Sequence, residues 1–335
     1  MIRAANDVGL RIALLRVAYA RSGFQAEVNP RQTRFIESDP ESYLKNLESL
    51  ISDLGAGGAG IGDDASSVEA LPDGRASDTA WVGVAPHSVR AVPLDYLRAV
   101  VSYANEHDLK THMHVAEQPA EVSACVEEYG RTPTALLESE GLLNPRFTAV
   151  HAIHVTPKAV ASLAQTGAMV CACPTTERNL GDGVVPANEY QRRGVSICLG
   201  TDSHAQIDLL EDARELEYHL RLQKLERAIL SSGSPDDALS NGAAAETAGY
   251  LFDCATIKGA RSIGAPGGML ASGKPADFFT VDLDDPTIAG ASPNGLLAAI
   301  VFTLSRAAVR EVVIGGKPIV SEGRHLIQED VVETI

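Results

Sequence analysis

The sequence has little positive charge for its length. Its 335 residues include 28 Lys and Arg against 44 Asp and Glu, which gives a formal net charge of −16. Nucleic acids and anionic membrane surfaces attract clustered positive charge, so this balance argues against both as partners. It also gives an anionic substrate no long-range attraction, so such a substrate would need local Arg or His residues. The length and the 45% hydrophobic content allow one large domain and a smaller one.

Paired cysteine motifs are also absent. None of the five cysteines, Cys125, Cys171, Cys173, Cys198 and Cys254, forms a Cys-x-x-Cys pair. We interpret them as buried free thiols in a reducing cytosol, in preference to a metal or redox role. This interpretation predicts a cytoplasmic protein.

Membrane spans, leader peptides and nucleotide-binding loops are not expected either. No apolar run approaches the roughly 18 residues of a membrane span. The early apolar stretch does not resemble a signal peptide, because Asp7 precedes it and Arg11 and Arg16 interrupt it. The glycine-rich run 55–60 lacks the Lys-Ser/Thr of a phosphate loop, so we predict a flexible surface insert over 55–78.

Strand-like segments alternate with helical segments along most of the chain. Strands are predicted at 12–19, 81–86, 110–116, 147–153, 168–173 and 196–199. Helices are predicted at 41–54, 95–105, 119–129, 132–138, 157–165 and 209–230. This alternation is typical of parallel β/α architecture. Polar residues follow five of the six strands, as in a (β/α)8 TIM barrel. A doubly wound sheet is the alternative, but its usual Gly-rich first turn is absent.

The texture of the sequence changes near Gly264. A turn-rich segment leads to a strand predicted at 278–282, and residues 309–320 are typical of a hairpin with a Gly315-Gly316 turn. We therefore predict a barrel domain over residues 1–263 and a small β domain over 264–335.

The most informative stretch is the strand that contains His112 and His114. Histidines two positions apart share one face of a strand, and Glu117 follows in the loop behind it. A metal ligand at a strand end, with a carboxylate just beyond it, is what metal-assisted hydrolysis requires. Taken alone, the stretch could equally be a solvated strand face. We expect His112 to be packed behind the metal ligand.

Five strand ends together carry a more specific pattern. They read Pro86-His87-Ser88-Val89-Arg90, His112-Met113-His114-Val115-Ala116-Glu117-Gln118, His151-Ala152-Ile153-His154, Cys173-Pro174-Thr175-Thr176-Glu177-Arg178-Asn179-Leu180-Gly181-Asp182-Gly183 and Gly200-Thr201-Asp202-Ser203-His204. In this order, they resemble the amidohydrolase superfamily, whose barrels hold a divalent metal. Within it, they are most similar to the formimidoylglutamate deiminases, the iminohydrolases of histidine degradation.

The resemblance implies catalytic roles for four positions. His114 matches a metal ligand, and Asp202 matches an acidic metal ligand that also takes the proton of the bound water. Glu117 matches the acid/base that brings a proton to the departing nitrogen. His151 matches a histidine beside the hydrolytic water.

The resemblance also implies the substrate and the cofactor. His87 and Arg90 match substrate-contacting groups, and a guanidinium suits a dicarboxylate because it pairs bidentately with carboxylates. The implied reaction converts N-formimino-L-glutamate to N-formyl-L-glutamate and ammonia, with one divalent metal, expected to be Zn²⁺. A small-molecule substrate is the expected partner, and a homodimer is compatible with the resemblance. His154 and His204 receive no role.

One expected element is missing from the sequence. Barrels of this superfamily begin with a strand that carries His-x-His, and no histidine precedes His87. If residues 12–19 form strand 3, then strands 1 and 2 and half of a small β-sandwich domain are absent, about a hundred residues judged from the ~250 of a full barrel. We therefore expect strands 3 to 8 and the C-terminal half of the sandwich. We also expect this chain by itself to bind metal weakly and to be inactive.

Two other functions stay open at this point. Another deaminase of the superfamily could act on a ring such as guanine, although the block 87–90 favours an acyclic, carboxylated substrate. A non-catalytic remnant or interaction protein is the second. The missing His-x-His favours it, and the four retained catalytic positions disfavour it.

Overall fold

The computed structural model describes residues 1–26, 28–57, 79–232 and 241–326. The helices are α1 (Ile2–Asp7), α2 (Pro40–Gly57), α3 (Leu94–Glu106), α4 (Pro119–Tyr129), α5 (Pro133–Ser139), α6 (Pro157–Thr166), α7 (Pro174–Leu180), α8 (Ala187–Arg192), α9 (Leu209–Lys224), α10 (Asn241–Ala255), α11 (Ile257–Ile263) and α12 (Leu296–Thr303), with 3-10 turns η1 (Thr33–Phe35) and η3 (Arg306–Ala308). The strands are β1 (Ile12–Ala18), β2 (Ala80–Pro86), β3 (Thr111–Val115), β4 (Phe147–His151), β5 (Met169–Ala172), β6 (Ile197–Leu199), β7 (Phe278–Val281), β8 (Val309–Ile314), β9 (Lys317–Ser321) and β10 (Arg324–His325). Most of the insert predicted over 55–78 lies outside the described residues, and its first three residues end α2.

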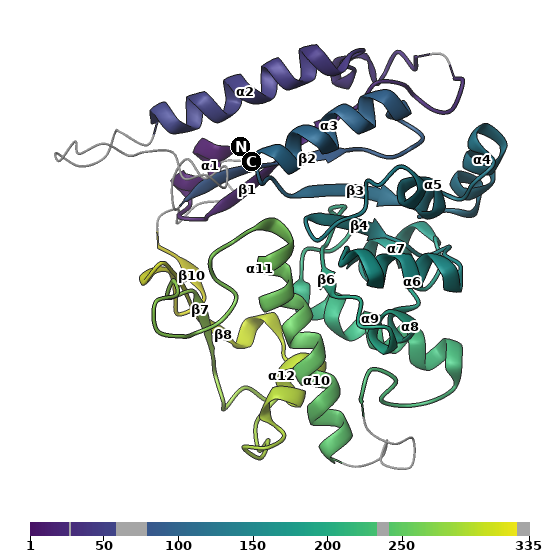
Figure 1. Ribbon diagram of the computed structural model, residues 1–335. Coiled ribbons are helices and arrows are strands. Elements are labelled where there is room, and N and C mark those ends of the chain that lie inside the picture. Colours follow the sequence, from purple (N-terminus) through teal and green to yellow (C-terminus); the bar gives the residue numbers. More distant parts are fainter. Residues whose placement is uncertain (27, 58–78, 233–240, 327–335) are drawn as a thin grey trace.

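Strands β1 to β6 form one parallel sheet in which each strand pairs with the next along the chain. The predicted parallel β/α architecture is therefore confirmed. A doubly wound sheet reverses its strand order at a switch point, and these six strands show no reversal. Figure 1 shows α2 and α3 on the side of β1 and β2, and α6 to α9 on the side of β4 and β6. The order is that of part of a barrel, while closure of the sheet is not shown.

The sheet is more deeply buried at β5 and β6 than at β1, the strand at its other edge. Every residue of β5 and β6 is buried, as expected for parallel strands covered on both faces. In β2, a Cβ on Gly83 would lie 2.6 Å from Leu15 Cδ2 and 2.9 Å from the Lys110 carbonyl oxygen. Glycine is therefore required there for β1, β2 and β3 to pack closely. β1 pairs with β2 alone among the described strands, and its Val17 is 50% exposed.

Proline and glycine set the limits of several helices. α4, α5, α6 and α7 begin with proline, which has no amide hydrogen to leave unpaired at that position. α4, α6 and α7 end at Gly130, Gly167 and Gly181, whose φ angles of 68° to 74° suit a residue without a Cβ. Within the described residues, no helix is both long and apolar enough to cross a bilayer.

The helix predicted over 209–230 is shorter than expected. α9 ends before Leu225, which takes a left-handed conformation with φ 58°. The chain then turns back, and the buried carboxylate of Glu217 accepts hydrogen bonds from the amides of Ile229 and Leu230 at 2.9 and 3.1 Å. The prediction was wrong because this tertiary contact replaces the helical hydrogen bonds.

The C-terminal region forms a four-stranded antiparallel sheet in the order β10-β9-β8-β7. The predicted hairpin is confirmed as β8 and β9, and Gly315 and Gly316 have the two positive φ angles, 57° and 78°, that its turn requires. Among the described residues this region contributes one sheet, and the predicted sandwich would need a second. α12, between β7 and β8, packs on α9 and α10.

A buried carboxylate connects α7 to α9. Asp212 is fully buried, and its Oδ1 accepts hydrogen bonds from the amide and hydroxyl of Thr175 at 3.0 and 2.8 Å. Its Oδ2 has no hydrogen-bond partner among the described residues. Burial raises the pKa of Asp212 to about 6, although the Thr175 hydrogen bonds act in the opposite direction.

Asp212 should make folding stability fall as the pH rises. The folded carboxyl holds its proton up to about pH 6, whereas an Asp in the unfolded chain ionises near pH ~3.9. The contribution of Asp212 to the free energy of unfolding is therefore complete below about pH 4 and is lost towards about pH 6, by at most about 3 kcal/mol.

Asp212→Asn should remove this pH dependence and keep the Thr175 hydrogen bonds. Urea unfolding on both sides of this pH window measures the effect, with exposed Asp253→Asn as the control. Equal pH dependence in the wild type and Asp212→Asn would contradict the raised pKa.

Candidate active site

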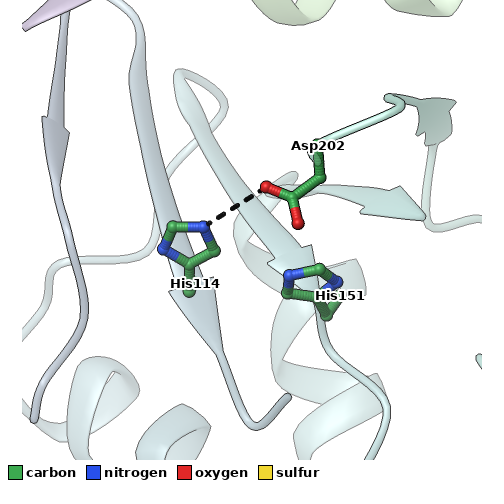
Figure 2. A group of neighbouring side chains, drawn as sticks. All are labelled: His114, His151 and Asp202. Atoms are coloured by element: carbon green, nitrogen blue, oxygen red, sulfur yellow. Dashed lines mark ion pairs between the residues drawn. The ribbon is translucent and has the colours of Figure 1, made fainter. Parts of the chain in front are cut away.

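Three side chains with metal-ligating atoms meet where parallel strands end. His114 lies in β3, His151 ends β4, and Asp202 follows β6. One nitrogen of each histidine and one carboxylate oxygen of Asp202 lie within 4.8 Å of one another. Figure 2 shows the group, with 4.0 Å between His114 Nε2 and Asp202 Oδ1. Parallel strands present their carboxyl ends at one edge of the sheet, and this brings the three residues together from distant parts of the chain.

The backbone carbonyl of His87 fixes the orientation of His114. This oxygen accepts a hydrogen bond from the His114 amide at 3.0 Å and lies 2.8 Å from His114 Nδ1. A carbonyl can only accept, so Nδ1 carries a hydrogen, and in the neutral imidazole the lone pair lies on Nε2, the nitrogen that faces Asp202. A neutral imidazole oriented by a carbonyl is the form in which histidine binds a metal.

His151 is fully buried and contacts a second carboxylate. Its Nδ1 lies 3.2 Å from Glu177 Oε1, within reach of a hydrogen bond. Its Nε2 has no hydrogen-bond partner in the described part of the chain, and Glu117 Oε1 lies beyond hydrogen-bonding range at 3.7 Å. Leaving a buried nitrogen unpaired costs free energy. The Nε2 therefore marks a place where a metal, a water or a substrate group would be bound favourably.

Glu177 also controls the protonation of His151. Burial lowers the pKa of His151, but the hydrogen bond and the charge of Glu177, with Glu117 and Asp202, outweigh burial and raise it. Burial raises the pKa of Glu177 as well. The His151–Glu177 pair therefore holds one proton more firmly than either group would alone.

Glu177 is a site residue to which the sequence assigned no role. It lies in the first turn of α7, is 1% exposed, and accepts a hydrogen bond from the Cys173 amide at 2.8 Å. Potential ligand atoms of Cys173, Glu177 and His151 also lie within 4.8 Å of one another. An acid in the first turn after a strand end was a visible signal. Its partner on another strand could not be read from the sequence.

The loop after β3 brings Glu117 towards His151. The buried carboxylate of Glu121 accepts hydrogen bonds from the amides of Ala116 and Glu117 at 3.3 and 2.9 Å. These two bonds hold the loop at the point where it leaves the strand. Glu121, like Glu177, was not recognised from the sequence.

Uncommon backbone conformations gather at this site. Ala116, His151, Ala152 and Asp202 have φ angles of 52°, 69°, 50° and 53°, although all four carry a Cβ. Such residues cost of order 1–3 kcal/mol each and persist where the surrounding structure holds them. Strained residues clustered at strand ends are typical of a functional site, where the backbone must hold side chains in one orientation.

His87 and Arg90 lie next to this cluster. The His87 ring is 4.6 Å from the His114 ring and 4.8 Å from that of Tyr19, measured between centroids. Burial lowers the pKa of His87 to about 3, assisted by His114 and Arg90, so its imidazole is neutral near pH ~7. Arg90 is half-buried, and its guanidinium makes no hydrogen bond or ion pair within the part of the chain that the structure describes.

The other histidines of the strand-end blocks do not join the cluster. His112 is buried, and its Nε2 lies 2.9 Å from the Ser262 carbonyl oxygen, which agrees with the packed position expected for it. His154 Nε2 lies 2.8 Å from the Asp182 carbonyl oxygen. His204 is exposed and lies outside the group of ligand atoms.

A cavity of about 310 Å³ adjoins the cluster, a volume suited to a small molecule. It is lined by His87, His112, His114 and Asp202 and by Leu15, Val17, Ala85, Pro86, Met113, Val150, Cys171, Cys173 and Gly200. All five cysteines are buried free thiols, as predicted.

Two imidazoles and a carboxylate are a ligand set that Zn²⁺ and similar ions accept. The lone pair on His114 and the unpartnered nitrogen of His151 make these residues fit such an ion.

The model of the amidohydrolase family matches residues 1–319. The chain belongs to this family. Two relatives of this chain are deaminases. Formimidoylglutamate deiminase of Pseudomonas aeruginosa is 34% identical over 328 residues, which are 98% of this chain and 65% of the relative. The 5-methylthioadenosine/S-adenosylhomocysteine deaminase of Haloarcula marismortui is 30% identical over 317 residues, 94% of this chain and 66% of the relative. The predicted similarity to formimidoylglutamate deiminase is confirmed.

Two solved structures have the same fold as this chain. An amidohydrolase from Brucella melitensis superposes with a TM-score of 0.82 at 32% identity and covers 99% of this chain and 66% of its own. An adenosine deaminase from Xanthomonas campestris, solved with bound zinc, gives 0.77 at 23% identity and covers 99% of this chain and 66% of its own. The chain thus spans about two thirds of the length of the relatives that it matches.

Glu177→Gln should weaken zinc binding while the fold is kept. The amide removes the charge that orients His151, and loss of such a partner typically costs 10- to about 100-fold in metal affinity. Competition with a chromophoric chelator measures the zinc affinity, and circular dichroism reports the fold. Glu189→Gln, whose side chain is 46% exposed, is the control. If Glu177→Gln and Glu189→Gln bind zinc equally well, Glu177 does not position this site.

Proposed function

We propose that the chain carries the hydrolytic site of a deiminase that converts N-formimino-L-glutamate and water to N-formyl-L-glutamate and ammonia. The observation that carries this proposal is the meeting of His114, His151 and Asp202 within 4.8 Å, with Glu117 at 3.7 Å from His151. Membership of the amidohydrolase family and the similarity to two deaminating relatives support a hydrolytic deamination.

We propose one divalent metal, Zn²⁺, with His114 and Asp202 as ligands and His151 Nε2 facing the same point. Zinc bound in the adenosine deaminase of the same fold supports this choice. A bound ion would lower the pKa of water from about 15.7 towards about 7.

The side chains of the chain would carry the proton transfers. Asp202, whose pKa is lowered chiefly by its contact with His114, is ionised and can accept a proton from the attacking water. The water oxygen adds to the formimino carbon and the C–N bond to the departing nitrogen breaks. Glu117 delivers a proton to that nitrogen, so ammonia leaves and not an amide anion. His151, whose pKa is raised by the hydrogen bond and charge of Glu177, can in its protonated form donate a hydrogen bond from Nε2 to developing negative charge.

Arg90 and His87 would select the substrate. Arg90 is a half-buried cation without a hydrogen bond or ion pair among the described residues, and it stands just past the strand end that carries His87. A guanidinium pairs bidentately with a carboxylate. Formiminoglutamate has two carboxylates, whereas methylthioadenosine has none and S-adenosylhomocysteine has one. This difference favours formiminoglutamate over the substrate class of the Haloarcula marismortui relative.

The same proposal extends to the architecture. The six-stranded sheet would be strands 3 to 8 of an eight-stranded barrel over residues 1–263. The C-terminal sheet would be half of a β-sandwich over residues 264–335. A cytoplasmic enzyme with a small-molecule substrate, as a monomer or homodimer, remains the expected setting.

An ammonia-release assay with a Glu117 variant tests the function. The chain is assayed alone and extended by the two strands that the resemblance implies, with formiminoglutamate and methylthioadenosine as substrates. We expect turnover of formiminoglutamate in the extended form, no activity of the chain alone, and loss on the order of 10²-fold or more in Glu117→Gln with the metal retained. Glu127→Gln, exposed on α4, is the matched control. Preference for methylthioadenosine, or loss of metal from Glu117→Gln, would refute these assignments.

Arg90→Met should act mainly on substrate binding. Removing a charged hydrogen bond costs about 1.5–3 kcal/mol, so KM for formiminoglutamate should rise roughly 10- to 100-fold with little change in kcat. Steady-state kinetics of the extended form measure both constants. Arg131→Met, at an exposed position, controls for the loss of a positive charge. An unchanged KM in Arg90→Met would exclude Arg90 as the anchor.

A further inference from the structure

A second cavity lies at the opposite end of the sheet from His114 and Asp202. Its volume is about 420 Å³. Trp81 near the start of β2, Lys110 just before β3, and the end of α11 with the loop behind it form its walls. The cavity is lined by Trp81, Val82, Asp108, Lys110, Ile257, Arg261, Ile263, Gly264, Ala265, Pro266, Gly267, Met269 and Lys274. It shares no lining residue with the cavity at the candidate active site.

Positive charge is concentrated in this cavity although the chain as a whole is acidic. Lys110, Arg261 and Lys274 line it, and none of their charged groups makes a hydrogen bond or ion pair with another described residue. Asp108 is the one acidic residue in the lining, and it is paired with Arg146. Three cations therefore face the cavity without a counter-charge from the lining.

Lys110 is the most telling of the three cations. It is half-buried, and burial together with the charge of Arg261 lowers the pKa of its ammonium group. A partly desolvated ammonium beside a guanidinium is unfavourable unless an anion compensates it. In a chain with a net charge of −16, such an arrangement marks a local anion site that long-range attraction does not explain.

The wall formed by the loop after α11 is preformed. Gly264 has φ 73°, and a Cβ there would lie 3.5 Å from Lys110 Cγ. Gly268 has φ 94°, and a Cβ there would lie 2.8 Å from Ala260 Cβ. The Trp81 indole donates a hydrogen bond to the Ile263 carbonyl at 2.6 Å and so ties the end of α11, where this loop begins, to β2. The loop is thus held over Lys110 by close packing on both sides.

We propose that this cavity binds a small organic oxyanion, with a phosphate or carboxylate group at Lys110 and Arg261 and an apolar part against Trp81 and Ile263. The volume exceeds what an inorganic anion needs, and the apolar lining residues give the remainder of the ligand a place to bind. The inference does not depend on the proposed catalytic function, because it uses none of the same residues.

Trp81 gives a direct readout, because it is the single tryptophan of the chain and lines the cavity. The 335-residue chain is titrated with inorganic phosphate, phenyl phosphate and glutarate at constant ionic strength set with sodium chloride, and tryptophan fluorescence is followed. We expect a saturable change with phenyl phosphate or glutarate at lower concentration than with inorganic phosphate. The better of the two organic probes identifies the charged group of the ligand.

Two variants assign the binding to this cavity. Lys110→Met and Arg261→Gln should each raise the dissociation constant about tenfold or more, because each removes a charge-assisted hydrogen bond. Arg261 is exposed, so its replacement leaves the fold intact even if the half-buried Lys110→Met does not fold. Lys158→Met, exposed on α6, should bind as the wild type does. Absence of saturation with all three probes, or equal binding by Arg261→Gln and the wild type, would overturn the proposal.

Discussion

The parallel pairing of β3 with β4 is the constraint on which the candidate site depends. In this register His114 lies beside Val150, and Val115 lies beside His151. The two histidines therefore lie near the ends of neighbouring strands at nearly the same height. Alternation alone would place them on opposite faces of the sheet, but the left-handed φ of 69° at His151 redirects the chain there, and the two rings lie 5.6 Å apart. A shift of one residue would turn His114 to the other face of the sheet, since side chains alternate along a strand. The buried strands on either side, each pairing with the next, hold this register.

Buried carboxylates then aim the reactive groups that the strands bring together. Glu177 contacts His151 and Glu121 holds the amide of Glu117, and both acids are almost fully buried. Burial raises the pKa of each, which shows that neither acid is placed where its charge is most stable. Together with the strained φ angles of Ala116 and Asp202, they are features that a protein selected for stability alone would avoid. Their concentration around one point is an argument for a site independent of any family resemblance.

The sequence predicted the strands and their polar ends well, because both signals are local. Apolar runs of strand length followed by His114 or Asp202 can be read without knowing what lies opposite. The end of α9 could not be read in the same way, since Leu225 stops the helix only because Glu217 binds amides beyond it. Glu177 was visible as an acid after a strand, but its role depends on His151 from a neighbouring strand. Residue types were thus predictable, whereas the contacts that orient them arise from the fold.

Both ends of the parallel sheet carry a half-buried cation, Arg90 at the carboxyl end and Lys110 at the amino end. With a Debye length of about 8 Å at physiological salt, the net charge of −16 acts weakly inside a cavity, and the nearest charges decide what can bind there. Most described Arg residues near the sheet are neutralised, as Arg16 is by Glu37 at 2.7 and 2.8 Å. Arg90 at the carboxyl end and Lys110 at the amino end are half-buried cations without such a partner among the described residues. A half-buried cation without an ion pair is unfavourable in the absence of an anion, so both are candidate positions for anion binding, with Glu121 near enough to Arg90 for the guanidinium to oppose the rise that burial causes in the pKa of Glu121. We propose that the first, next to His87, binds the substrate, and that the second, against β2 and α11, binds a separate ligand.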